Sequence, residues 1–240
     1  MSFKFQRIAI FGSTGGIGSA LLNAFASFID TQQIYSFSRS PQALQSPLVT
    51  HIPIQLDSEL EIKTACDQLP EDLCFDLVMV TSGLLHDDGL LPEKKLDDLS
   101  ETSLRRLFEI NTIAPMLVAK YMIPRLSKSG PAIFSALSAR VGSISDNRLG
   151  GWYGYRASKA ALNMMIRTLA IEQKRLFPSQ IIVGLHPGTV ATPLSDPYIK
   201  AKKSVFMPEE SAAHLIQVLS QLSPLDSGYC FAWDGTQIPF

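Results

Sequence analysis

Residues 7–18 read Arg-Ile-Ala-Ile-Phe-Gly-Ser-Thr-Gly-Gly-Ile-Gly, a short apolar run that ends in a glycine cluster. The run at 7–11 is typical of a buried parallel strand, because its apolar residues do not alternate with polar ones. Apolar residues then recur at helical spacing from Ala20 to Phe25. A glycine loop between a strand and a helix lets backbone amides approach a pyrophosphate, which the helix dipole also favours. The residues that we expect at this nucleotide site are Gly12, Ser13, Thr14, Gly16, Ile17 and Gly18.

The glycine spacing is Gly-x-x-x-Gly-x-Gly, with a longer first gap than the Gly-x-Gly-x-x-Gly dinucleotide pattern. No Lys-Ser or Lys-Thr pair follows the last glycine, which excludes a P-loop. A tight loop that binds no ligand remains the alternative.

The end of the second expected strand, 33–38, bears on the choice of nucleotide. Sites for NAD carry an Asp or Glu there, about 20 residues after the glycines, to bind the free ribose hydroxyl. This chain has Ser38, Arg39 and Ser40 instead. A guanidinium matches the geometry of a phosphate, so the sequence favours NADP(H) over NAD. The alternative is that Arg39 is an ordinary solvated side chain.

Further apolar runs predict more strands, with helical periodicity between them. The expected strands cover 49–56, 76–80, 132–136, 181–186 and 229–233, and the longest expected helices cover 100–126, 153–176 and 211–222. This alternation indicates an α/β fold, a single doubly wound parallel sheet of the Rossmann type with helices on both faces. No linker or repeat interrupts it, so we expect residues 1–240 to form one domain.

Polar and small residues follow several of the expected strands. Asp57 could accept a hydrogen bond from an adenine amino group, or it could cap the helix that begins after Ser58. Ser82 and Gly83 would allow a cofactor to approach the backbone closely. His86 lies in a polar segment and is interpreted first as an ordinary loop histidine, with a role in lining a pocket as the alternative.

Pro115 interrupts the helical pattern at 100–126 and predicts a kink or break there. A proline has no N–H, so a carbonyl near Asn111 loses its usual helical partner. Asn111 is therefore a functional candidate, and a buried structural asparagine is the alternative.

Tyr155 and Lys159 are four residues apart in a helical pattern, so they lie one turn apart on the same face. An ammonium beside a phenol favours the phenolate and lowers its pKa, ordinarily about 10. Such a tyrosine could transfer protons near neutral pH. The alternative is an exposed helix pair without chemistry.

Composition excludes several classes of protein. Of 240 residues, 18% are charged and the net charge is -1, which gives no electrostatic footprint for nucleic acid. The three cysteines show no Cys-x-x-Cys pairing, so neither a disulfide framework nor a zinc site is expected. No apolar segment reaches the roughly 20 residues of a membrane helix, and no signal peptide is evident. We expect a soluble, cytoplasmic protein without metal.

Five pieces stand in order along the chain: Gly12-x-x-x-Gly16-Ile17-Gly18, Asn111, Ser138, Tyr155-x-x-x-Lys159 and Pro187-Gly188-x-Val190-x-Thr192. Together they resemble the short-chain dehydrogenase/reductase family over nearly the entire chain. The runs at 140–147 and 154–163 are most similar to its carbonyl-reductase branch, which includes the C-factor and sniffer proteins. Thr81-Ser82-Gly83 departs from the Asn-Asn-Ala-Gly run of that family.

The resemblance implies a role for each matching residue. Tyr155 would be the general acid, and Lys159 would lower its pKa and hold the nicotinamide ribose. Asn111 would keep a water in a proton relay through its main-chain carbonyl. Residues 187–192, with Pro187, Gly188, Val190 and Thr192, would close over the nicotinamide, and 193–208 would form a substrate lid.

Ser138 would hydrogen-bond the substrate oxygen as charge develops on it. It lies farther from Tyr155 than is usual in the family, and Ser143 is closer to the usual interval. We favour Ser138 because a strand end positions a group better than a loop does.

The leading hypothesis is an NADPH-dependent oxidoreductase that reduces an aldehyde or ketone. A nucleotide-binding sensor or interaction module without turnover is one alternative, and an NAD-linked alcohol dehydrogenase is another. The expected partner is a small carbonyl or alcohol substrate, neither nucleic acid nor membrane. The resemblance also implies a homodimer or homotetramer.

Overall fold

A computed structural model describes residues 5–41, 45–199 and 204–240 of the chain. Its eight strands form one sheet in the order β3-β2-β1-β4-β5-β6-β7-β8. The first seven strands are parallel, and only β8 runs antiparallel, against β7. The strands are β1 (Arg7–Phe11), β2 (Gln33–Ser38), β3 (Val49–Pro53), β4 (Leu77–Val80), β5 (Ala132–Leu137), β6 (Gln180–His186), β7 (Cys230–Ala232) and β8 (Gln237–Ile238).

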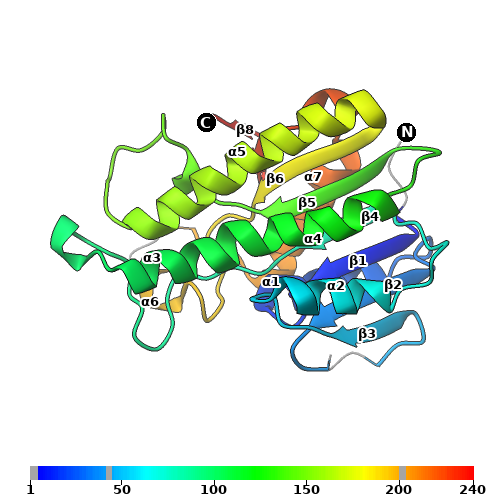
Figure 1. Ribbon diagram of the computed structural model, residues 1–240, viewed down its shortest axis with the longest axis horizontal. Helices are drawn as coiled ribbons and strands as arrows, with labels where there is room; N and C mark the ends of the chain where they lie inside the picture. The colour runs from blue at the N-terminus through cyan, green and yellow to red at the C-terminus, as the bar shows by residue number, and fades with distance from the viewer. Residues whose placement is uncertain (1–4, 42–44, 200–203) are drawn as a thin grey trace.

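Helices cover both faces of the sheet, as Figure 1 shows. In that view α2, α4 and α5 lie in front of the sheet, and α1 and α7 lie behind it. The helices are α1 (Gly16–Ala26), α2 (Glu59–Asp67), α3 (Glu101–Phe108), α4 (Ala114–Met122), α5 (Tyr153–Leu176), α6 (Asp196–Ile199) and α7 (Pro208–Gln221).

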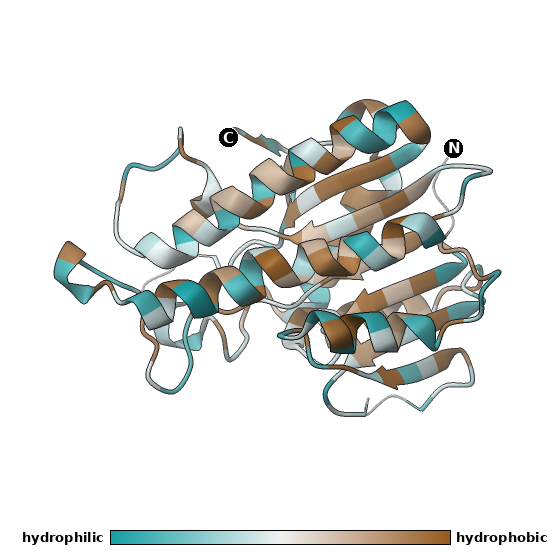
Figure 2. Ribbon diagram, viewed as in Figure 1, coloured by the Kyte–Doolittle hydropathy of each residue, from teal (hydrophilic) through white to brown (hydrophobic). Residues whose placement is uncertain are grey.

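Each face of the sheet has its own apolar core. Val118 of α4 and Leu162 of α5 pack in one core, and Leu21 of α1 and Leu215 of α7 pack in the other. The central strands are apolar along their length, which Figure 2 shows as brown arrows. Burial on both faces explains why these strands show continuous apolar runs. The predicted doubly wound parallel sheet is confirmed.

Two strand predictions were wrong in detail. The third strand was expected at 49–56 but ends at Pro53, and one further ladder bond, from the Ile54 N–H to the Ser38 carbonyl at 3.2 Å, follows it. The short strand β8 was not predicted, because two residues carry too little periodicity to be recognised.

The helix expected at 100–126 is interrupted as Pro115 predicts. A π-helical turn, Glu109–Ile113, separates α3 from α4. Asn111 lies inside this turn, four residues before the proline whose missing N–H would have bonded its carbonyl. The kink is confirmed, and it takes the form of a π-turn.

The described helices include none that is both long enough and apolar enough to cross a membrane.

Candidate active site

The carboxyl ends of the central strands open into a cleft of about 610 Å³. Such an edge is the usual place for a ligand in an open α/β sheet. Because β3, β2, β1, β4, β5 and β6 are neighbours in that order, the cleft has an end at β2–β3 and an end at β5–β6. The predicted residues that line it are Gly12, Thr14, Gly16, Ile17, Ser38, Arg39, Asp57, Ser82, Gly83, Ser138, Tyr155, Lys159, Pro187 and Thr192.

The glycine loop is shaped by close approach of backbones. Gly12 has a φ of +84°, and a Cβ there would lie 2.8 Å from the backbone nitrogen of Ser82. A Cβ on Gly18 would lie 2.3 Å from the carbonyl oxygen of Gly12. These two positions therefore require glycine.

The amino terminus of α1 faces this loop with its backbone donors available. Its N-cap, Gly15, supplies no side-chain hydrogen bond, and the first turn contains no acidic residue. Four N–H groups at a helix start have no intrahelical partner, and they attract anions. The middle of the cleft, at the start of α1, fits the pyrophosphate of a dinucleotide.

The side chains at the β2–β3 end are charged. Arg39 is exposed after β2, and the hydroxyl of Ser38 donates to the carbonyl of Ser40 at 2.7 Å. Oδ2 of Asp57 lies 3.9 Å from a guanidinium nitrogen of Arg106 of α3, a residue with no recognisable motif in the sequence. Asp57 does not cap α2, because the hydroxyl of Ser58 accepts from the Glu61 N–H at 3.4 Å. The capping alternative for Asp57 was therefore wrong.

Tyr155 and Lys159 lie in the first two turns of α5 and line the cleft together. The Lys159 nitrogen is 5.9 Å from the centre of the Tyr155 ring and donates to the Leu137 carbonyl at 2.7 Å. The Lys159 side chain is only 2% exposed. Burial lowers the pKa of this lysine to about 8.

The expected lowering of the Tyr155 pKa is wrong for this structure. Burial raises the pKa of Tyr155 to about 12 instead. The physical reason is that desolvation penalises the phenolate, while the Lys159 ammonium is hydrogen-bonded to a backbone carbonyl. Tyr155 is therefore a protonated phenol at neutral pH, and burial makes it a weaker acid than an exposed tyrosine.

Ser138 lines the cleft immediately after β5, and its hydroxyl already has a partner. It donates to Oδ1 of Asn163 at 2.6 Å, and both side chains are buried. Asn163 follows Lys159 by one more helical turn, so Tyr155, Lys159 and Asn163 share one face of α5. That spacing in the sequence could have identified Asn163.

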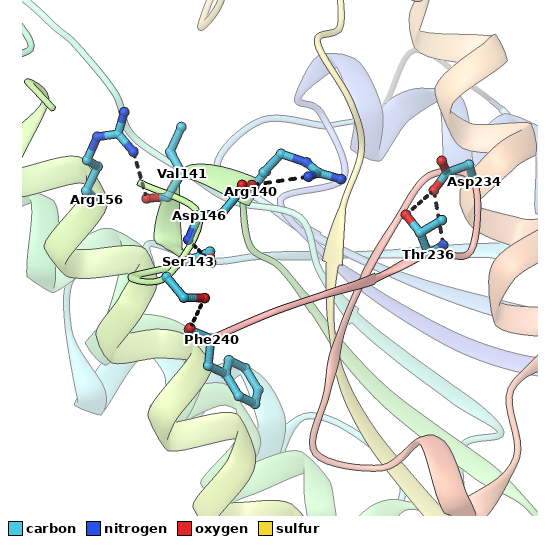
Figure 3. Close-up of polar contacts among 9 residues, drawn as sticks. Arg140, Val141, Ser143, Asp146, Arg156, Asp234, Thr236 and Phe240 are labelled. Carbon is cyan, nitrogen blue, oxygen red and sulfur yellow. Dashed lines mark hydrogen bonds and ion pairs between the residues drawn. The ribbon is translucent and has the colours of Figure 1, made fainter. Parts of the chain in front are cut away.

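Ser143 lies outside the cleft lining, in the loop between β5 and α5. Its hydroxyl accepts from the Asp146 N–H at 3.1 Å, and Asp146 also pairs with Arg140 at 3.1 Å. Figure 3 shows these contacts, with Arg156 donating to the Val141 carbonyl beside them. Ser143 thus stabilises the loop, whereas Ser138 lines the same cleft as Tyr155.

Asn111 is fully buried next to the cleft rather than in its lining. Its amide side chain exchanges two hydrogen bonds with the backbone of Leu84, at 2.9 and 2.7 Å. It also donates to the hydroxyl of Ser158 at 3.2 Å. The side chain therefore ties the loop after β4 to α5.

Ser13, Gly18, Gly188 and Val190 were predicted to bind cofactor and also lie outside the cleft lining. The Ser13 side chain is fully buried, with its Oγ 2.8 Å from that of Ser36. Gly188 packs against Phe206 and has a φ of +82°. Val190 forms a β-bridge with Phe206, which holds the end of the segment expected as a lid.

The expected lid, 193–208, includes α6 and the first residue of α7. Pro193 and Leu194 line the cleft. Residues 200–203 of this segment lie outside the described residues.

The amino-acid sequence of this chain is similar to that of known proteins. A family model described as short chain dehydrogenase matches residues 6–203. The C-signal protein of Myxococcus xanthus is 33% identical over 146 residues, which cover 60% of this chain and 83% of that protein.

Two solved structures share the fold. The NADPH-bound carbonyl reductase from chicken fatty liver superposes with a TM-score of 0.88 and 24% identity, over 100% of this chain and 96% of that one. The carbonyl reductase Sniffer of D. melanogaster gives a TM-score of 0.86 at 21% identity, over 98% of this chain and 99% of that one.

Proposed function

This chain belongs to the short-chain dehydrogenase family, and on that premise we propose that it is an NADPH-dependent oxidoreductase that reduces an aldehyde or ketone. The observation that carries the proposal is that Tyr155 and Lys159 share one cleft with the glycine loop. A dinucleotide on that loop would extend along the strand ends toward Tyr155.

Each part of this cleft has a group that could bind one part of the dinucleotide. The amides at the start of α1 would bind the pyrophosphate, and Arg39 would bind a ribose phosphate. Lys159 would hold the nicotinamide ribose, and Pro187 and Thr192 would lie against the nicotinamide. When bound, the cofactor supplies the hydride for the carbonyl carbon.

The remaining step is proton transfer to the carbonyl oxygen. Tyr155 is protonated at neutral pH, and it donates its hydroxyl proton to this oxygen. The Lys159 ammonium lies close enough to stabilise the phenolate that remains. Ser138 donates to the substrate oxygen once its hydroxyl turns from Asn163.

The end of β2 favours NADP(H) over NAD. No acidic residue stands at the end of β2, where NAD sites carry one. The carbonyl reductase from chicken liver is described as bound to NADPH, in agreement with this choice.

We also propose a homodimer through the outer faces of α4 and α5. A groove of about 470 Å³ runs between these helices, lined by apolar residues such as Ile113, Met116 and Met165.

The cytoplasm is the proposed location, since Cys66, Cys74 and Cys230 are free thiols.

The test replaces Tyr155 with Phe and follows NADPH oxidation against a panel of aldehydes and ketones. We expect turnover to fall by about 10²–10⁴-fold, because the proton donor is lost. The NADPH dissociation constant should stay within a few-fold, which shows that the fold is intact. Turnover that survives within about tenfold would exclude Tyr155 as the acid, and NADPH binding without turnover by the unmodified chain would favour a sensor.

A further inference from the structure

The helix that carries Tyr155 begins without a side-chain cap of its own. The N-cap residue of α5 is Trp152, whose side chain forms no capping hydrogen bond, and the first turn contains no acidic residue. An indole has an N–H donor but no acceptor, so Trp152 cannot accept from the N–H groups of this turn. Its φ of 53° is left-handed, whereas N-cap residues normally have extended backbone. Because Gly154 in the first turn is buried, its N–H needs an acceptor from elsewhere in the chain.

Glu93, which lies 61 residues before Gly154 in the sequence, supplies that acceptor. Its Oε2 accepts from the Gly154 N–H at 3.2 Å. Its main-chain carbonyl accepts from the Trp152 N–H at 2.5 Å, so this one residue bonds to two N–H groups at the start of α5. Glu93 lies between β4 and α3 and is only 2% exposed. The loop after β4 is thereby joined to the helix that carries Tyr155.

The carboxyl group of Glu93 is enclosed between α3 and the start of α5. A Cβ added to Gly154 would lie 2.9 Å from Oε1 of Glu93 and 2.6 Å from Cδ1 of Leu107. Leu107 belongs to α3 and is itself buried. The first turn of α5 therefore lies against Glu93 and α3 with no space for a side chain between them, which fixes where this turn begins.

Burial of this carboxyl group is costly for stability. None of the lysines, arginines and histidines that the structure describes forms an ion pair with Glu93. Its Oε1 is buried and has no hydrogen-bond partner among the described residues. A buried polar oxygen without a partner destabilises a folded chain, and an apolar side chain of similar size would avoid that cost. A polar group at such a position indicates a role other than stability.

We propose that Glu93 is a positioning residue for Tyr155. The inference rests on the proposed function, because it concerns the proton donor of that reaction. Gly154 directly precedes Tyr155, so the hydrogen bond from its N–H fixes the backbone from which the Tyr155 side chain extends. Glu93 does not line the cleft, and it therefore acts through α5 and not on the substrate. A displacement of about 1 Å at a reacting group can slow an enzyme by about 100-fold.

The test compares Glu93→Met with Glu93→Gln. Met removes the acceptor and keeps a long apolar side chain, whereas Gln retains an oxygen that can accept from the Gly154 N–H. The rate of hydride transfer is measured in a single turnover, from the loss of NADPH absorbance, with the best substrate of a carbonyl panel. We expect transfer to be about 10- to 100-fold slower in Glu93→Met and to recover to within about threefold in Glu93→Gln. The NADPH dissociation constant should stay within about twofold in both, because Glu93 does not line the cleft.

Asp226→Ala is the matched control for the loss of a carboxyl group that accepts a backbone N–H. Asp226 accepts from the Ser223 N–H at 2.8 Å. It lies in the turn before β7, at the amino end of a parallel strand and hence at the edge of the sheet opposite the cleft. We expect its rate of hydride transfer to stay within about twofold of that of the unmodified chain.

A second measurement reports on Tyr155 itself and does not need turnover. Tyrosine labelled with carbon-13 at the ring Cζ gives one NMR signal for each of the six tyrosines, and Tyr155→Phe identifies the signal of Tyr155. We expect this signal to shift in Glu93→Met and to return to its place in Glu93→Gln. The signal of Tyr35, a buried residue of β2, should stay in place and show that the variants are folded. Glu93→Asp, whose side chain is one CH₂ shorter, tests the same hydrogen bond if Glu93→Met does not fold.

The outcomes separate the positioning role from the proposed reductase. A rate within about twofold in Glu93→Met, or a Tyr155 signal that does not move, overturns the role of Glu93. A loss of rate that Glu93→Gln does not restore also overturns it, because the accepted hydrogen bond would then not be the cause. A Tyr155 signal that shifts and returns as expected, in a chain that turns over no carbonyl compound, supports the role of Glu93 and contradicts the reductase.

Discussion

Two parts of the cleft are built in different ways. The part at the glycine loop is made mostly of backbone, with Gly12 and Gly18 packed so closely that a Cβ would contact main-chain atoms. The part near Tyr155 is made of side chains, and Leu84, Tyr155 and Leu194 reach it from segments far apart in the sequence. A site for a shared cofactor can be fixed by local geometry, whereas substrate choice depends on side chains that the fold brings together.

The largest expected effect comes from adding a side chain where two backbone segments touch at the glycine loop. Gly12→Ala places a Cβ 2.8 Å from the Ser82 nitrogen at a φ of +84°, so it combines a clash with an unfavourable conformation. We expect a loss of about 2–4 kcal/mol in the free energy of unfolding, together with weaker NADPH binding. Denaturant unfolding and NADPH titration measure both.

Gly235→Ala is the matched control for this substitution. Gly235 has a φ of +82°, but nothing lies within 4 Å of its added Cβ. It should cost only about 1–2 kcal/mol, the strain of the left-handed backbone. Equal losses in the two variants would show that the packing of Gly12 against Ser82 is unimportant.

Lys159→Met should affect the free energy of unfolding and the turnover rate in different ways. Removing a buried ammonium relieves desolvation, so the free energy of unfolding should stay unchanged or rise by about 1–3 kcal/mol. Turnover should fall by about a hundredfold or more, because the charge beside Tyr155 is lost. Thermal unfolding and steady-state rates are compared with those of Lys63→Met, which removes an exposed lysine of α2. Full activity in Lys159→Met would remove this lysine from the mechanism.

Arg39→Asp tests the one side chain on which the choice of cofactor depends, with the smallest expected effect. NADPH affinity should fall by about tenfold, as a phosphate partner is replaced by a like charge, and NADH affinity should hold or improve. Isothermal titration with both nucleotides measures this. Arg105→Asp, a charge reversal on the exposed side of α3, is the control. An unchanged ratio of the two affinities would show that Arg39 plays no part in cofactor choice.

Features of the site that depend on local sequence could be predicted, whereas contacts between distant segments could not. The strand–glycine–helix order and the Tyr155–Lys159 spacing are local patterns, and the structure brings these residues to one cleft. Pro115 predicted the disturbed helix at Asn111, because a missing N–H acts on its own chain neighbours. Arg106 carried no such signal, since it reaches Asp57 across a distance of 3.9 Å that only the fold sets.

The electrostatic prediction failed for a related reason. Sequence spacing placed an ammonium one turn from Tyr155, but it could not show that this ammonium bonds the Leu137 carbonyl. Nor could it show how strongly burial acts on the phenol. Desolvation depends on the whole surrounding structure, so local patterns do not predict its size.

The most direct test of the account is a crystal structure of the chain with NADPH. We expect the pyrophosphate to lie against the amides at the start of α1 and the nicotinamide to lie beside Tyr155 and Lys159. A nucleotide bound outside this cleft, or bound with its adenine beside Tyr155, would contradict it.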